Sequence, residues 1–188
     1  MKTLTAVSTL PLTRRAPAVP LRSSTIRRAE PSDASAIHAL IATHLDEGRL
    51  LPRDPDEVFL HSHRFVVAVD GDRVVACADL APLSRTVAEV RSLVVGADAR
   101  SAGLGRRLID ELVERATVAG FEKLCAFTHA PAYFVQLGFS LVPHVWLPEK
   151  IETDCRRCAH FRGCGQYAVT LALTRSRQAC VPLGSLHG

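Results

Sequence analysis

The sequence predicts an α/β fold with a mixed, mostly antiparallel central sheet flanked by helices. Strand-like and helix-like segments interleave along the chain, and two apolar runs are joined by an Asp70-Gly71 turn that is typical of a hairpin. A third apolar run, 90–95, passes through a glycine-rich turn into an amphipathic helix. With 188 residues, 47% of them hydrophobic, the chain is long enough for one domain with its own core.

The remaining elements follow from periodicity and end signals. Pro31-Ser32-Asp33 can start and cap a helix, in which apolar residues recur at helical spacing until Gly48 ends it. "RDPDEVFLH" indicates a short second helix, and Gly120 ends the amphipathic one. The expected ranges are strands at 23–29, 64–69, 73–83, 86–95, 122–128, from Gly138 and at 166–173, and helices at 31–47, 53–61, 103–119 and 130–137.

Charge and composition divide the chain into three parts. We expect a disordered or transit-like leader at 1–24, a domain at 25–173 and a tail at 174–188. Six of the 23 basic residues lie in 1–29, which leaves 17 against 19 acidic residues in the rest. The domain is therefore near neutral and poor in aromatic residues, so we expect no nucleic-acid partner. No apolar run reaches the roughly 18 residues of a membrane span. A cytoplasmic location is expected, with organellar targeting by the basic leader left open.

The glycine-rich turn predicts an anion site. Backbone N–H groups and the helix dipole stabilise negative charge at a helix N-terminus. Gly103 and Gly105 allow close approach of the backbone, and Arg100 and Arg106 can neutralise further charge. The turn lacks the Lys-Ser/Thr pair of a nucleoside-triphosphate loop and the dinucleotide G-x-G-x-x-G pattern. The ligand is therefore expected to carry phosphate without being a nucleoside triphosphate.

The strand, "RSAGLG" and helix, with the Asp-Gly hairpin before them and "APAYFVQLGF" after them, resemble the GCN5-related N-acetyltransferase (GNAT) family over about residues 25–173. The resemblance implies the GNAT acyl-CoA N-acyltransferase fold and acetyl-CoA as co-substrate. It places backbone N–H groups of the turn on the pyrophosphate, and the preceding strand on the pantetheine arm and thioester carbonyl. The implied coenzyme-binding residues are Leu93, Val94, Val95, Arg100, Ser101, Ala102, Gly103, Leu104, Gly105 and Arg106.

Two further stretches of the sequence concern the acceptor, which is the molecule that would receive the acetyl group. "GRLLPRDPDEV" (48–58) and "LPEKIETDCRRCAHFRGCGQYAV" (147–169) resemble short, stand-alone N-acetylglutamate synthases of arginine biosynthesis. This resemblance implies acetyl transfer to the α-amine of an amino acid, with L-glutamate as the leading acceptor. A diacid needs cationic partners, and Arg53, Arg91 and Lys150 are the candidates, although each could be an ordinary surface charge.

The acid–base groups are less well determined. The acceptor's ammonium must lose a proton, because an α-amine titrates near ~8. Glu89, at the start of the central strand, is the candidate general base, and His129 could relay through water. Many GNAT relatives carry a tyrosine general acid four residues before the glycine of "GF", where this chain has Phe134. Tyr133 is one position away and is expected to face elsewhere, so we assign no acid.

The pattern C-x2-C-x5-C in the loop 143–165 suggests a structural zinc site. Cys155, Cys158 and Cys164 could be ligands, and the fourth could be His160, His144 or Cys180. The alternative is that these cysteines are simply reduced.

Three functions remain open at this point. The first is amino-acid N-acetylation, and the second is acetylation of a protein N-terminus, a lysine or a small amine. The third is a non-catalytic acyl-CoA-binding module, and a homodimer is possible for any of them.

Overall fold

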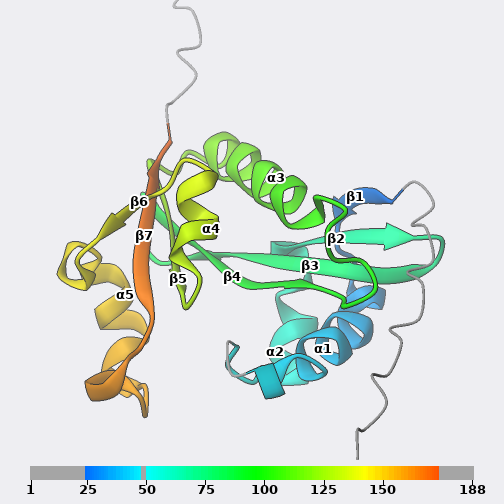
Figure 1. Ribbon diagram of the computed structural model, residues 1–188, viewed down its shortest axis with the longest axis horizontal. Helices are drawn as coiled ribbons and strands as arrows, with labels where there is room; N and C mark the ends of the chain where they lie inside the picture. The colour runs from blue at the N-terminus through cyan, green and yellow to red at the C-terminus, as the bar shows by residue number, and fades with distance from the viewer. Residues whose placement is uncertain (1–23, 48–49, 174–188) are drawn as a thin grey trace, which may run out of the picture.

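A seven-stranded sheet forms the centre of the protein (Figure 1). The computed structural model describes residues 24–47 and 50–173. The strand order is β1-β2-β3-β4-β5-β7-β6, and every neighbouring pair is antiparallel except β4 and β5. This confirms the predicted mixed, mostly antiparallel sheet. The strands are β1 (Thr25–Arg28), β2 (Phe65–Asp70), β3 (Arg73–Pro82), β4 (Val87–Val95), β5 (Lys123–Thr128), β6 (Ser140–Val142) and β7 (Tyr167–Ala172).

Helices cover both faces of the sheet, with α1 and α2 on one side and α3 on the other (Figure 1). Alternation along β2 explains the two layers, because successive side chains of a strand point to opposite faces. Val66 and Ala68 pack in the cluster beneath α3, whereas Phe65 and Val67 pack in the cluster beneath α1. The helices are α1 (Ala34–Ala42), α2 (Pro55–Leu60), α3 (Leu104–Val118), α4 (Pro131–Gln136) and α5 (Pro148–Thr153).

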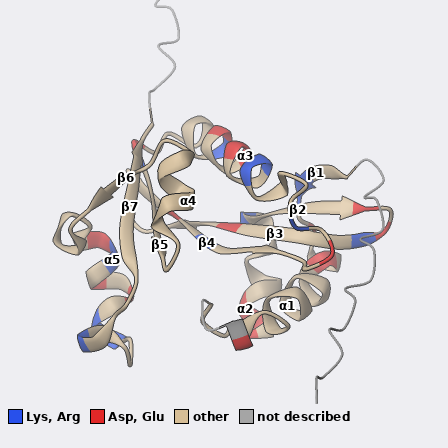
Figure 2. Ribbon diagram, in the orientation of Figure 1, with Lys and Arg blue, Asp and Glu red and all other residues tan. Residues whose placement is uncertain are grey.

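The helix α3 has the amphipathic pattern that the sequence predicts. Leu104, Leu108 and Leu112 are fully buried against the sheet. Its charged residues include both signs, as Figure 2 shows, and are not a stripe of positive charge. Within the described residues, no helix is long and apolar enough to cross a bilayer.

Two sequence expectations need correction. The first helix ends at Ala42 and does not continue to Gly48, which lies outside the described residues. The side chains of Thr43 and His44 both hydrogen-bond to the Leu40 carbonyl, at 2.9 and 2.8 Å, and so compete with continued helical bonding. The helix α5 lies in the loop 143–165, where no helix was expected. The leader to residue 23 and the tail from 174 are also outside the described residues.

Candidate active site

A cavity opens where the two parallel strands, β4 and β5, diverge. The pairing of β4 with β5 runs from Val87↔Lys123 to Val90↔Ala126 and goes no further along the described strands. Beyond that point lies a cavity of about 1510 Å³, walled by the end of β4, the turn before α3, the segment from β5 into α4, and the segment from α5 to 166. The side of β4 that faces the cavity therefore has backbone N–H and C=O groups without strand partners.

A β-bulge at Ser92 changes the direction of β4 at the cavity. The β3–β4 register shifts between Cys77 and Asp79, and Ser92 has a φ of 49°, in the left-handed region. The Cys77 thiol donates to the Ser92 carbonyl at 3.6 Å, which holds the bulge from the buried side. No residue in "VRSLVV" marks a bulge, because Ser92 is neither glycine nor asparagine. The sequence therefore gave no signal for this feature.

The glycine-rich turn before α3 forms part of the cavity wall. Gly103 adopts a φ of 73° as the N-cap of α3, and Ser101 has a φ of 71°. A Cβ on Gly105 would lie 2.5 Å from the Tyr133 hydroxyl oxygen, so this glycine leaves room for a close neighbour. Every predicted coenzyme-binding residue except Ala102 lines the cavity. These residues are Leu93, Val94, Val95, Arg100, Ser101, Gly103, Leu104, Gly105 and Arg106.

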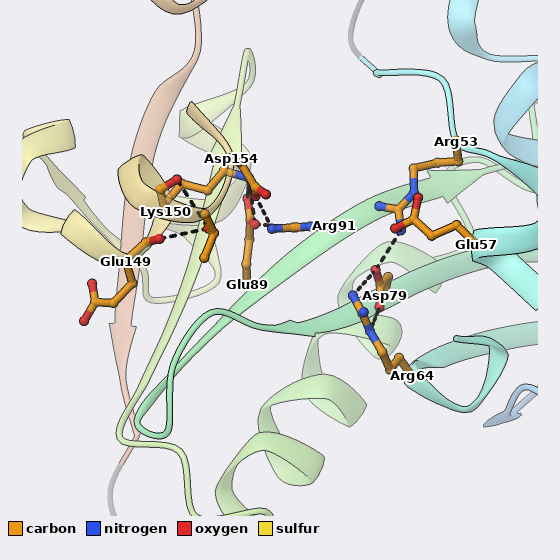
Figure 3. Close-up of polar contacts among 10 residues, drawn as sticks. Arg53, Glu57, Arg64, Asp79, Glu89, Arg91, Glu149, Lys150 and Asp154 are labelled. Carbon is orange, nitrogen blue, oxygen red and sulfur yellow. Dashed lines mark hydrogen bonds and ion pairs between the residues drawn. The ribbon is translucent and has the colours of Figure 1, made fainter. Parts of the chain in front are cut away.

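Glu89, Arg91, Lys150 and Asp154 form one group of ion pairs, which we call the Glu89 cluster (Figure 3). Glu89 is buried and accepts from Arg91 Nε at 2.5 Å, and Lys150 Nζ lies 2.8 Å from its carboxylate. Asp154 binds the same two cations: it contacts Arg91, and its Oδ2 is 2.8 Å from Lys150 Nζ. Burial lowers the pKa of Arg91, but Glu89 and Asp154 outweigh burial, so the pKa of this guanidinium is raised. Both cations already have carboxylate partners.

A second group, the Asp79 cluster, consists of Arg53, Glu57, Arg64 and Asp79 (Figure 3). Arg64 donates to both oxygens of the fully buried Asp79 at 3.1 and 2.9 Å, and Arg53 lies 3.5 Å from it. Burial raises the pKa of Asp79, while Arg64 and Arg53 oppose that shift. The Arg53 side chain is 10% exposed and lines the cavity, and its buried Nε has no hydrogen-bond partner in the described part of the chain.

The side chain of Tyr133 does not lie where helical geometry predicted. It was expected to face away from the site, yet both Tyr133 and Phe134 line the cavity. The helix α4 is only six residues long and borders the cavity, so positions about 100° apart both reach its wall. Burial raises the pKa of the Tyr133 phenol, and Asp110 adds to the rise. Its hydroxyl lies against Gly105.

The cysteines do not form the predicted metal group. Among the described residues, no three His, Cys, Asp or Glu side chains are placed to hold a metal ion. Cys155 and Cys158 are half-buried and Cys164 is exposed, all three in the cavity wall. His144 bonds to the Gln166 carbonyl at 2.9 Å, and Cys180 lies outside the described residues. The geometry therefore gives zinc no support at this loop.

Comparisons with known proteins agree with this architecture. The model of the acetyltransferase (GNAT) family matches residues 34–139. An uncharacterized N-acetyltransferase of Chlorobaculum tepidum is 28% identical over 155 residues, which are 82% of this chain and 100% of that protein. The amino-acid acetyltransferase of Pectobacterium carotovorum is 29% identical over 127 residues, 66% of this chain but only 29% of that enzyme. This chain thus spans less than a third of the length of such amino-acid acetyltransferases.

Solved structures extend the comparison. N-acetylglutamate synthase of Neisseria gonorrhoeae, in complex with coenzyme A and N-acetyl-glutamate, superposes with a TM-score of 0.74 and 26% identity, over 82% of this chain and 36% of that one. Rv2747 of Mycobacterium tuberculosis, in complex with coenzyme A and NLQ, shares the fold with a TM-score of 0.69 and 22% identity, over 80% of this chain and 99% of that one. Since the family model covers more than half of the chain, this protein belongs to the acetyltransferase (GNAT) family.

Proposed function

We propose that this acetyltransferase moves the acetyl group of acetyl-CoA to the α-amine of L-glutamate. The observation that carries the proposal is a single cavity that joins the glycine-rich N-terminus of α3 to three cations, Arg53, Arg91 and Lys150. Relatives named amino-acid acetyltransferase, and the likeness to an N-acetylglutamate synthase that binds coenzyme A and N-acetyl-glutamate, support the same assignment.

The coenzyme is proposed to lie from the α3 N-terminus to the Ser92 bulge. Backbone N–H groups between Ser101 and Arg106 would bind the pyrophosphate, and the first turn of α3 adds its dipole. The backbone of Leu93 to Val95 would hydrogen-bond the pantetheine arm, because no described strand pairs with that side of β4 beyond Val90. The coenzyme's thioester would then reach the end of the cavity where the Glu89 cluster lies.

The acceptor is proposed to bind between the two ion-pair clusters. The unpartnered Arg53 Nε is a donor for one carboxylate of the acceptor. Arg91 and Lys150 are donors for the other, but Asp154 already contacts both cations. Asp154 is 36% exposed, whereas Glu89 is 3% exposed, so the acceptor's carboxylate would displace Asp154 and leave Glu89 in place. Exchanging one carboxylate for another keeps the cations paired.

In the proposed reaction, the free amine attacks the thioester carbonyl carbon. A backbone N–H of β4 near the bulge would stabilise the oxyanion of the tetrahedral intermediate. The nitrogen gives up its remaining extra proton to solvent, the C–S bond breaks, and coenzyme A leaves as a thiolate, which solvent protonates. Glu89 is proposed to take the ammonium proton through water, and this requires that one of its two cation contacts open.

The test is thiol release from acetyl-CoA with glutamate, aspartate, glutamine, a lysine peptide or no acceptor. We expect turnover with glutamate, and Arg53→Ala should raise the KM for glutamate about 10- to 100-fold, the loss of one charge-assisted hydrogen bond. Arg85→Ala, which changes an exposed arginine away from the cavity, is the matched control. Turnover with the peptide alone would point to protein acetylation, and coenzyme binding without any turnover would point to a binding module.

A further inference from the structure

A tight backbone turn brings two of the cysteines in the loop 143–165 close together. Cys155 begins the 3-10 helix Cys155–Arg157, Cys158 follows it, and the Cys158 N–H donates to the Cys155 carbonyl at 3.0 Å. Side chains three residues apart in a 3-10 turn eclipse one another, and such a turn brings the Cα atoms within about 7 Å. Cα atoms of a disulfide are about 4.4 to 6.8 Å apart. A bond between these two sulfurs therefore needs little movement of the backbone.

The surroundings of this pair differ from those of the core cysteines. Cys77 and Cys125 are fully buried, and burial raises the pKa of each thiol to about 12, so both are inert. Cys155 and Cys158 are only half-buried and line the cavity. The Cys158 sulfur also accepts from the His160 N–H at 3.4 Å.

The pair is also directly joined to the acceptor end of the cavity. Asp154 immediately precedes Cys155 and contacts both Arg91 and Lys150 in the Glu89 cluster. For an acceptor carboxylate to reach these cations, Asp154 must move away from them. Any bond that stiffens the turn after Asp154 therefore acts on the same contact.

We propose that Cys155 and Cys158 are a redox modification site, and that their disulfide restrains Asp154 on the acceptor-binding cations. The second half of this statement rests on the proposed function. The oxidant is a low-molecular-weight disulfide. The Cys158 thiolate attacks one of its sulfurs and expels one thiolate, and the Cys155 thiolate then attacks the Cys158 sulfur and expels the second. Two cysteine thiols and one disulfide thus become one protein disulfide and two small thiols.

The closing step of the proposed exchange depends on the Cys155 thiol. Burial raises the pKa of its thiol, with Cys164 and Asp154 adding to the rise and Lys150 opposing it. Ring closure is therefore expected to accelerate with rising pH, because it requires the Cys155 thiolate. Cys164, which is exposed and electrostatically coupled to Cys155, is the competing partner that the experiment must distinguish.

The first measurement maps the disulfide in the full chain after treatment with oxidised glutathione. Arg156 and Arg157 lie between the two cysteines, so trypsin separates the two cysteine peptides unless a disulfide joins them. We expect the Cys155–Cys158 peptide pair in the native protein and in Cys164→Ser, and its loss in Cys158→Ser. Absence of the pair, or a Cys155–Cys164 pair in its place, overturns the proposal. This readout does not depend on any enzymatic activity.

The second measurement compares the oxidised and reduced protein in the thiol-release assay, with excess oxidant removed. The KM for glutamate should rise about five-fold or more on oxidation, with the KM for acetyl-CoA unchanged. Dithiothreitol should reverse the effect, and Cys158→Ser should not respond. An unchanged KM in a protein shown to carry the disulfide refutes the link to Asp154. A protein that forms the disulfide but turns over no glutamate refutes the proposed function and leaves the modification site standing.

Discussion

Gly105→Ala gives the sharpest test of how the glycine-rich turn and α4 meet. The new Cβ would lie 2.5 Å from the Tyr133 hydroxyl oxygen, 3.4 Å from its Cζ and 3.8 Å from a methyl of Val95. Overpacking of this kind costs about 1–3 kcal/mol, while alanine gains about 1 kcal/mol over glycine inside a helix. We therefore expect a net loss of about 0–2 kcal/mol in the free energy of unfolding.

Making the same substitution in a Tyr133→Phe background separates the cost of overpacking from the gain in helix propensity. Removing the hydroxyl leaves Cζ, at 3.4 Å, as the nearest atom, which is an ordinary contact. Gly105→Ala should then be neutral or stabilising by up to about 1 kcal/mol, so the two changes should couple by about 1–3 kcal/mol. Urea unfolding of the four proteins at one pH measures this coupling. If Gly105→Ala has the same effect in both backgrounds, the phenol does not lie against this glycine and the reasoning is wrong.

Three more predictions concern charge and packing. Asp154→Asn should lower the KM for glutamate by up to about five-fold, because a partly exposed ion pair contributes at most about 1 kcal/mol; an increased KM in the thiol-release assay would contradict this. Asp33→Asn should lower the free energy of unfolding by about 1–2 kcal/mol at neutral pH. The hydrogen bond from Arg27 lowers the pKa of Asp33, so its contribution is present above the unfolded pKa of about 3.9 and is lost as pH falls through the lowered folded pKa. Urea unfolding from pH 7 toward about pH 2 should show the variant and the native protein converging, and a constant gap would disprove the pairing. Leu108→Ala should lower the free energy of unfolding by about 2–5 kcal/mol in the same assay, because Leu108 is fully buried. Val118→Ala, at an exposed site, should change that free energy by less than about 0.5 kcal/mol.

Local signals in the sequence were enough to locate most of the elements. The Asp70-Gly71 turn is found as predicted, with Gly71 at a φ of 61°, and Gly120 ends α3 at a φ of 85°. Both positions need a left-handed backbone, which glycine adopts without strain. The end of α1 was missed because it depends on the side chains of Thr43 and His44 bonding to a carbonyl, which the apolar period does not show.

The candidate site was predictable in its residues but not in its contacts. Arg53, Arg91, Lys150 and Glu89 all line the cavity, as proposed from residue type and family resemblance. Their partners were not foreseen, because Asp154 lies 63 positions from Arg91 and only the folded chain brings them together. Cations that looked available to a substrate are instead already paired. For these cations to bind the acceptor, a carboxylate of the acceptor must replace a carboxylate of the protein.

The divergence of β4 from β5 has a consequence for the kind of molecule that the sheet can bind. Exposed strand edges are templates for pairing with other chains, and most proteins cover or shorten them. Here the described parts of β4 and β5 do not pair beyond Val90↔Ala126, and residues 92–95 of β4 line the cavity. A thin, extended molecule with amide groups of its own can add to such an edge as a short strand would. The split sheet thus presents this edge to a slender ligand inside the cavity, and to solvent when the cavity is empty.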